Sequence, residues 1–266
     1  ATISSLRFNC VRLPYSLELA IGDAGLQPFS ESKARVSLAA NPELQGLSPL
    51  RIFDATVSAL TDAGLVVILN NHVSSSQWCC GEDDGEGLWH TEAYNESVWL
   101  DSLGFMAARY STNPRVVGFD LRNEIRAAAS VAPTWGHGDP STDWAEAAAK
   151  GGERVAAENE DLLVIVSGLF FSMYLCDVPL RPIHMQVPAL RNRTVYTVHE
   201  YEWYFSNLSY YHILLGRWTW QYLRALGALA VVFALAATIV SAPHGRLERF
   251  LRVHGVRSFS GCCHYV

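Results

Sequence analysis

Largely apolar runs, separated by stretches with helical spacing, limit the folds that this chain can adopt. Three of the runs are Gly64–Asn70, Arg115–Leu121 and Asp161–Val166. Two shorter runs, Phe8–Leu13 and Thr194–Val198, have the same character. A strand that is buried on both faces shows a continuous apolar run rather than alternation. We therefore expect these segments to be strands of a parallel sheet.

The segments between the runs have the spacing of amphipathic helices. Pro49–Ala63 follows Ser48, a suitable N-cap, and Val98–Tyr110 and Thr142–Glu158 behave similarly. Alternation of strands and helices predicts a parallel sheet with right-handed crossovers. A doubly wound sheet and a (β/α) barrel both satisfy this pattern. No GxGxxG sequence follows a strand, so a dinucleotide site is not supported.

Polar side chains at the carboxyl ends of four runs favour the barrel. The runs lead into Arg12, Asn70-Asn-His72, Arg122-Asn-Glu124 and His199-Glu-Tyr201. A barrel collects its active site from several strands at this edge. The alternative is that these residues only cap strands where the chain reaches the surface. Four such ends favour a shared site over capping.

Composition excludes several classes of protein. Half of the residues are hydrophobic, so the chain can bury a sizeable core and is not disordered. The net charge is −6 and no long basic stripe is present, which argues against nucleic acid as a partner. Charged residues make up only 17%, and this deficit is typical of many buried strands or of a membrane segment.

The C-terminal part differs from the rest, and we treat residues 221–266 as a separate segment. Residues 225–243 are all uncharged, close to the length of ~20 residues that crosses a bilayer. Trp218, Trp220 and Tyr222 precede this run and several arginines follow it, so a spanning helix would have a cytoplasmic C-terminus. The alternative is a buried barrel helix. The flanking residues favour the membrane.

Cysteines and sequons bear on the compartment. Six cysteines are too few for a disulfide-built scaffold, and no CxxC pair offers a zinc site. Cys79 and Cys80 are adjacent, and a long-range bridge from this pair stays open. Three sequons, at Asn95, Asn192 and Asn207, permit glycosylation in a secretory compartment. No signal peptide or initial Met is present, so we expect a processed or truncated N-terminus.

Glu124 is the strongest candidate for catalysis. It follows Asn123 directly after an apolar run, so its side chain should project into the mouth of a barrel. Partial burial would raise the pKa of its carboxyl group and keep it protonated near neutral pH. That property suits a general acid in glycosidic bond cleavage. The alternative is a surface glutamate paired with Arg122 or Arg126.

The ordered set of motifs resembles glycoside hydrolase family 5, the cellulase-type (β/α)₈ barrels. The motifs are Phe8–Tyr15 with Arg12, Asn70-Asn-His72, Leu121–Glu124 and His199–Tyr201. Val66–Cys80, and Pro133–Pro140 followed by Asp143-Trp144, are similar to fungal and plant members. The resemblance covers about residues 6–220, and we expect residues 1–220 to form an incomplete barrel equivalent to strands two to six.

The resemblance implies roles for individual residues. Glu124 matches the acid/base, and Asn123 matches the residue that bonds the sugar 2-hydroxyl. Arg12 and His72 match groups that orient the nucleophile and the −1 sugar. His199 and Tyr201 match the pair that frames the catalytic carboxylates, and Trp78 would stack on a sugar ring or pack on the barrel rim; these are the remaining expected site residues. The family needs no cofactor, and we expect no metal.

The chain departs from the family at both ends. Ala1–Leu6 matches only the tail of the family's first helix, and the eighth strand is missing. The nucleophile should be a glutamate on the seventh strand, but only Glu202 and Glu248 follow Tyr201, and neither follows an apolar strand. The family pattern is lost after about Ala225, through a genuine membrane anchor or through a change of reading frame.

Two functions follow from these expectations. The first is a glycosidase that acts on β-glucan or cellulose-like polysaccharides by a retaining two-carboxylate mechanism. The alternative is an inactive, membrane-tethered protein that binds carbohydrate. Either would lie outside the cell or on the outer face of its membrane.

Overall fold

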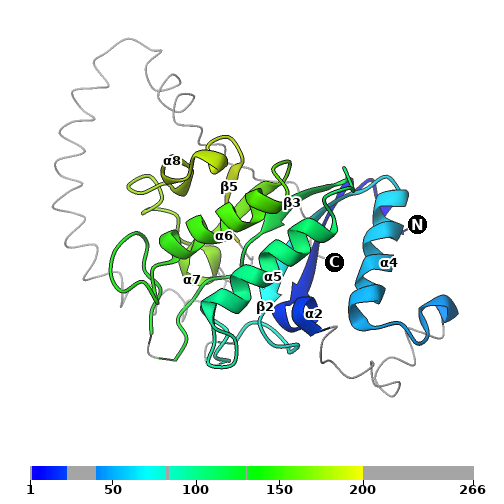
Figure 1. The fold of residues 1–266 in the computed structure, drawn as a ribbon, viewed down its shortest axis with the longest axis horizontal. Coiled ribbons are helices and arrows are strands. Elements are labelled where there is room, and N and C mark those ends of the chain that lie inside the picture. The colour runs from blue at the N-terminus through cyan, green and yellow to red at the C-terminus, as the bar shows by residue number, and fades with distance from the viewer. Residues whose placement is uncertain (1, 23–39, 82–83, 130, 200–266) are drawn as a thin grey trace, which may run out of the picture. The chain divides into compact units, whose positions relative to one another are not determined.

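The computed structural model describes residues 2–22, 40–81, 84–129 and 131–199. Within these ranges five strands form one parallel sheet (Figure 1): β1 (Cys10–Ser16), β2 (Val66–Val73), β3 (Val116–Asp120), β4 (Leu163–Ser167) and β5 (Thr194–Thr197). The longer helices are α4 (Pro49–Asp62), α5 (Glu96–Arg109) and α6 (Trp144–Glu158). The short helices are α1 (Thr2–Ser5), α2 (Leu17–Ile21), η2 (Pro42–Leu44), α7 (Leu169–Ser172), α8 (Ile183–Gln186) and η3 (Pro188–Leu190).

The strand order separates the two folds that the sequence left open. The described strands lie in the order β1-β2-β3-β4-β5, and every neighbouring pair is parallel. A doubly wound sheet reverses its order at a switch point, whereas a barrel adds each strand beside the previous one. The described part of the chain is therefore a five-stranded parallel α/β sheet with the order of a barrel segment.

All five predicted strands are confirmed, with shifted boundaries. β1 continues past Leu13 to Ser16 and so includes Pro14, which pairs in register with Asn70. Proline lacks a backbone N–H and is tolerated where one side of a strand has no partner in the sheet. Among the described strands β1 pairs only with β2, and this explains how Pro14 is accommodated.

The three predicted helices are also confirmed, and their starts follow their caps. Ser48 Oγ accepts a hydrogen bond from the backbone N–H of Arg51, as predicted for the start of α4. Asn95 caps α5 and Asp143 caps α6 through their side-chain oxygens. These caps place the helix starts at Glu96 and Trp144 rather than at Val98 and Thr142.

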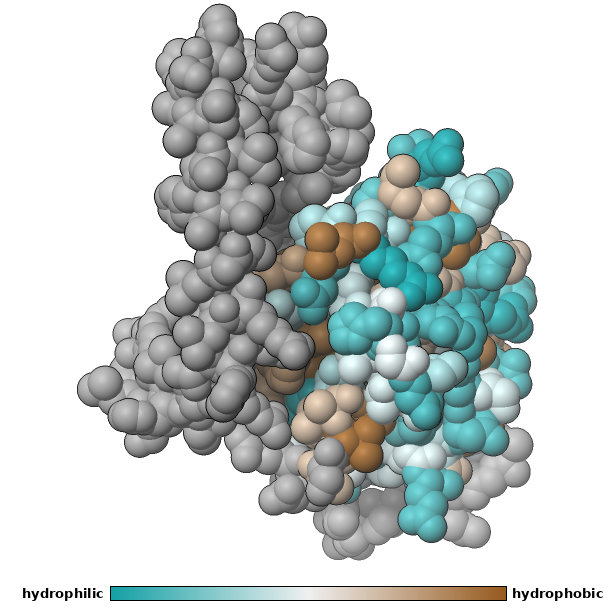
Figure 2. Space-filling model, turned by 90° about the vertical axis from the view of Figure 1, so that its left-hand side faces the viewer, coloured by the Kyte–Doolittle hydropathy of each residue, from teal (hydrophilic) through white to brown (hydrophobic). Residues whose placement is uncertain are grey.

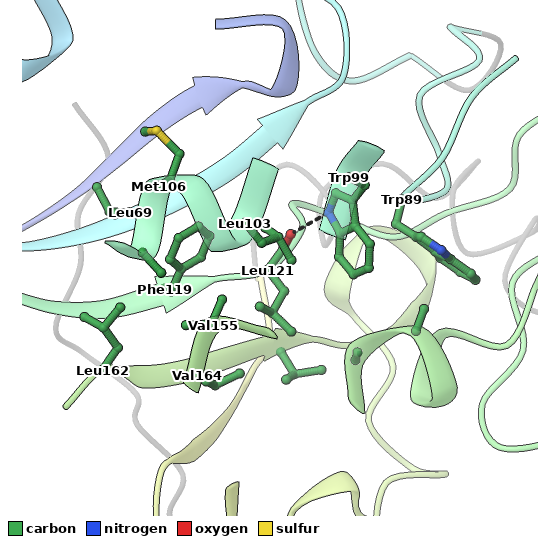
Figure 3. Close-up of a cluster of buried hydrophobic side chains, with 14 of the residues drawn as sticks. Leu69, Trp89, Trp99, Leu103, Met106, Phe119, Leu121, Val155, Leu162 and Val164 are labelled. Carbon is green, nitrogen blue, oxygen red and sulfur yellow. Dashed lines mark hydrogen bonds between the residues drawn. The ribbon is translucent and has the colours of Figure 1, made fainter. Parts of the chain in front are cut away.

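The core lies between the sheet and helices α5 and α6, which run side by side (Figure 1). Figure 3 shows apolar side chains of both helices meeting those of β2, β3 and β4, and the indole N–H of Trp99 donating to the Leu121 carbonyl. A Cβ on Gly151 of α6 would lie 2.7 Å from the Trp99 ring, so only glycine permits this close approach. The packing of α5 and α6 thus buries the face of the sheet that these helices cover.

The surface gives no sign of a large apolar patch on the side drawn in Figure 2, where hydrophilic residues predominate and hydrophobic ones are scattered. In the described ranges, every helix is too short or too polar to span a bilayer. The predicted apolar helix, the membrane segment at 225–243 and the division at residue 220 all lie outside those ranges.

Candidate active site

The sheet brings predicted site residues from four strands to one edge. Since all strands are parallel, their carboxyl ends share that edge. Arg12 lies on β1 and His72 on β2, while Glu124 follows β3 and His199 follows β5. Arg12 contacts Asn123 in the segment after β3, and Glu124 of that segment contacts His199 after β5, as the barrel interpretation predicted.

Glu124 is buried and contacts a histidine from a distant strand. Its side chain is 8% exposed, and Glu124 Oε1 lies 2.9 Å from Nδ1 of His199. The backbone at Glu124 has φ 44°, in the left-handed region that non-glycine residues seldom adopt. Arg126 donates to the Glu124 carbonyl at 3.1 Å. A strained backbone held by its neighbours is common at active sites.

The alternative interpretation of Glu124 as a surface partner of Arg122 or Arg126 is wrong. Arg122 binds Glu86 at 2.9 Å, and Arg126 binds Asp84 at 2.6 Å. We call these two ion pairs the anchor pairs, because Glu86 and Asp84 belong to the loop that follows β2. With both arginines occupied there, Glu124 faces His199 instead.

Arg12 joins two residues at the end of β3. Its Nε donates to Asp120 Oδ2 at 2.8 Å, and its Nη2 donates to Asn123 Oδ1 at 2.8 Å. The backbone N–H of Asn123 also donates to the Asn71 carbonyl at 2.9 Å. We call Arg12, Asp120, Asn123, Glu124 and His199 the site network.

His72 is neutral in the folded chain at neutral pH. Its Nδ1–H donates to Asn70 Oδ1 at 2.6 Å, because an amide oxygen can only accept. Burial, followed by the positive charge of Arg12, lowers the pKa of His72 to about 4. The imidazole therefore presents Nε2 as an acceptor rather than as part of a cation.

Two predicted site residues are not placed in the site network: one is exposed in a loop, and the other lies outside the described residues. Trp78 lies in the loop after β2 and is 93% exposed, so it does not pack on the rim. A freely accessible indole face suits stacking on a sugar ring. Tyr201 lies outside the described residues, as do Glu202 and Glu248, the acids weighed as nucleophiles.

Sequence reasoning missed Asp120 and Glu86. Asp120 is 1% exposed and binds Arg12; the signal for it was an acid inside an otherwise apolar strand. Glu86 accepts from the backbone N–H groups of Ser74 and Ser75. Burial acts to raise the pKa of Glu86, but these donors and Arg122 outweigh it and lower the pKa. No local pattern marked Glu86.

One described cluster has the composition of a metal site. Ligand atoms of His72, Cys79 and Cys80 all lie within 4.8 Å of one another. The two sulfurs are bonded to each other, so the pair makes no long-range bridge and offers no thiolate. The donor set therefore does not fit a metal ion in this state.

Comparison with known proteins identifies similar sequences over most of the chain. The family model described as Cellulase (glycosyl hydrolase family 5) matches residues 1–226. A glycosyl hydrolase 5 family protein of Chamaecyparis obtusa is 35% identical over 209 residues, covering 75% of this chain and 35% of that protein. An endoglucanase of Paenibacillus polymyxa is 34% identical, covering 73% of this chain and 47% of that protein.

Solved structures of cellulases have a similar fold. The catalytic domain of the major endoglucanase of Xanthomonas campestris aligns with a TM-score of 0.62 at 29% identity, covering 82% of this chain and 62% of that one. A cellotetraose complex of the Pyrococcus horikoshii endocellulase aligns with a TM-score of 0.61 at 28% identity, covering 75% and 55%. The chain spans 35% of the Chamaecyparis obtusa protein and 47% of the Paenibacillus polymyxa endoglucanase, less than half of each relative's length.

Proposed function

The chain belongs to glycosyl hydrolase family 5, and on this premise we propose that it hydrolyses O-glycosidic bonds in β-glucans such as cellulose. Relatives named endoglucanase and the cellotetraose complex of a similar fold support this substrate class. The observation that carries the proposal is Glu124, buried at the strand-end edge with Oε1 2.9 Å from His199 Nδ1.

In this reaction Glu124 is the general acid/base. It protonates the glycosidic oxygen as the bond to the leaving sugar breaks, and then removes a proton from the water that completes hydrolysis. Arg12 and Asn123 fix the edge beside it, and His72 accepts a hydrogen bond from substrate. His199 and Tyr201 orient the carboxylates, and Trp78 stacks on a sugar. The reaction needs no cofactor.

A retaining mechanism requires a second carboxylate about 5–5.5 Å from the first. That carboxylate attacks the anomeric carbon and forms a covalent glycosyl-enzyme, which water then cleaves. A 2-fluoro cellobioside with a good leaving group traps this intermediate, and mass spectrometry of the labelled peptide identifies the nucleophile. Absence of any labelled peptide in an active preparation would rule out the retaining mechanism.

Glu124→Gln tests the assignment of the acid. We expect kcat/KM on cello-oligosaccharides to fall about 10²–10⁴-fold, because amide cannot donate the proton. With a dinitrophenyl cellobioside as substrate, the rate of the first chemical step should fall far less, since that leaving group needs no protonation. Glu153→Gln, at an exposed position of α6, is the matched control and should keep full activity. Equal turnover by the two variants would overturn the role of Glu124.

The second candidate is a carbohydrate-binding protein without activity. It is favoured by the sequence after Tyr201, whose two acids, Glu202 and Glu248, do not follow an apolar strand of the kind that carries the family's nucleophile. This candidate predicts binding of cellotetraose in calorimetry with no release of reducing sugar. Hydrolysis by the full chain would exclude it.

We further propose an extracellular location, with residues 225–243 crossing the membrane if they form a helix. The uncharged run and the three sequons support this location. Retention of the expressed chain in membranes after alkaline carbonate extraction tests the span. A mass shift on endoglycosidase treatment tests glycosylation, and a chain that shows neither would contradict the proposal.

A further inference from the structure

The loop between β2 and α5 is fixed at its base by buried charge. Glu86 is 3% exposed and accepts from the backbone N–H groups of Ser74 and Ser75 at 2.6 and 2.9 Å. The guanidinium of Arg122, which is fully buried, completes its shell at 2.9 Å. A carboxylate with this many donors holds the loop without help from the sulfurs.

A second anchor holds the far side of the same loop. Asp84 accepts from both Arg126 Nη2 and the backbone N–H of Gly81, at 2.6 and 2.7 Å. Arg126 Nε donates to the Gly81 carbonyl at 3.0 Å. The segment between the anchors, which carries Cys79 and Cys80, is therefore presented toward the site network from a rigid base.

The disulfide between Cys79 and Cys80 meets the side-chain amide of Asn123. Asn123 Nδ2 lies 3.5 Å from Sγ of Cys79 and 3.3 Å from Sγ of Cys80. The orientation of this amide follows from Arg12, because a guanidinium only donates and so must face the amide oxygen. Nδ2 then faces the two sulfurs, which are weak acceptors.

Asn123 is thus held from both sides. Asn123 is 2% exposed. Glu124 follows it directly, and the residue after that, Ile125, is buried in the core. Glu124 has a left-handed backbone with φ 44°. A misplacement of about 1 Å in such a group can cost up to 10²-fold in rate.

We propose that the Cys79–Cys80 disulfide is a positioning element of this active site: it fixes the amide of Asn123 beside Glu124, and its reduction releases that amide. The effect on catalysis rests on the proposed glycosidase function, whereas the effect on the amide does not. Tris(2-carboxyethyl)phosphine supplies the two electrons and water the two protons, giving two thiols and the phosphine oxide.

Nuclear magnetic resonance of the ¹⁵N-labelled full chain tests the contact directly. The side-chain amide signals of Asn123 are assigned by their loss in Asn123→Asp. In the oxidised chain we expect a well-resolved pair that exchanges slowly with water. After reduction we expect both signals to shift and their exchange with water to accelerate at least about tenfold. Unchanged signals would overturn the proposal.

Variants separate this contact from general effects of reduction. Cys79→Ala/Cys80→Ala should change the Asn123 signals in the same way without reductant. Cys176→Ala, at an exposed cysteine in another loop, should leave them unchanged. If the double variant does not fold, reduction of the folded chain still decides the question. A lower melting temperature with unmoved Asn123 signals would assign the disulfide a purely structural role and overturn the proposal.

Kinetics then separate this inference from the proposed function. On cello-oligosaccharides we expect reduction to lower kcat about tenfold with a smaller change in KM. A chain that neither binds nor cleaves glucan when oxidised refutes the proposed function, while the amide signals still decide whether the disulfide positions Asn123. A chain that cleaves equally well in both states refutes the positioning role.

Discussion

Two sets of charged and polar groups share the segment after β3 and differ in their partners. Arg122 and Arg126 turn back to the loop after β2, where each meets a carboxylate of the anchor pairs. The site network lies at the edge formed by the carboxyl ends of the strands, where Glu124 contacts His199. The anchor pairs join groups of opposite charge, whereas the site network joins a carboxylate to an imidazole. The first arrangement holds the fold together, and the second contains the residue that we propose as the acid.

The largest effect is expected at the anchor pairs. Arg122→Met leaves the Glu86 carboxylate buried without an opposite charge, which costs about 3–5 kcal/mol of unfolding free energy. Chemical denaturation measures this loss. Arg51→Met is the matched control, since that side chain is 65% exposed and lies 3.8 Å from Asp54; we expect less than about 0.5 kcal/mol there. Equal losses would remove the distinction between buried and surface pairs.

The second effect concerns acid stability through His72 at the site edge. Its pKa is about 4 when folded and near 6.5 when unfolded, so the unfolded chain binds the proton more readily. Stability should therefore fall by about 3 kcal/mol as the pH drops from 6.5 to 4. His72→Asn should make the unfolding free energy nearly independent of pH between 6.5 and 4.

The contribution of Glu86 to stability should be lost at lower pH than that of His72. The pKa of Glu86 is lowered from 4.5, so its contribution is present above that pH and is lost only below it. Urea unfolding at a series of pH values separates the two windows. A slope between pH 6.5 and 4 that persists in His72→Asn would show that another group is responsible.

A smaller effect is expected from Arg12→Lys in the site network. Lysine keeps the positive charge beside Asp120 but cannot bond Asp120 and Asn123 through a planar fork. We expect kcat/KM to fall about tenfold and the unfolding free energy by about 1 kcal/mol. If only the unfolding free energy falls and kcat/KM does not, Arg12 stabilises the fold as the anchor pairs do and has no role in catalysis.

The smallest effect is expected at Trp78. Because the side chain is 93% exposed, Trp78→Ala should change the unfolding free energy by less than about 0.5 kcal/mol. Binding of longer cello-oligosaccharides should weaken several-fold, by about 1 kcal/mol, if the indole stacks on a sugar. Calorimetry with a series of chain lengths measures this. An affinity that is unchanged at every length would exclude the stacking role.

The strands and helices could be predicted because their signals are local. Each apolar run became a strand, and Ser48 capped α4 as expected. Boundaries moved by a few residues where a cap or an edge position decided them, as at Asn95 and Pro14. The alternation alone could not give the sequential strand order, because both candidate folds share it, whereas the polar strand ends favoured the barrel, whose order the described strands have.

The site was predicted where its residues lie on or directly after strands. Glu124, His72 and His199 were found because parallel strands end at one edge, whereas Arg12 lies within β1, which continues to Ser16. Glu86 and Asp120 were not, since their partners lie 36 and 108 residues away along the sequence. Such pairings depend on tertiary packing, for which a single sequence gives no spacing rule. The contact of Asn123 with the disulfide escaped for the same reason.

The left-handed backbone at Glu124 has a consequence for how this position changes over generations. With φ 44°, conformational preference alone would place glycine or asparagine there. Under the proposed function, selection for folding and selection for activity therefore favour different residues at position 124. A gene copy no longer selected for the proposed activity would be free to lose this glutamate early, while the buried arginines of the anchor pairs would persist for as long as the chain must fold.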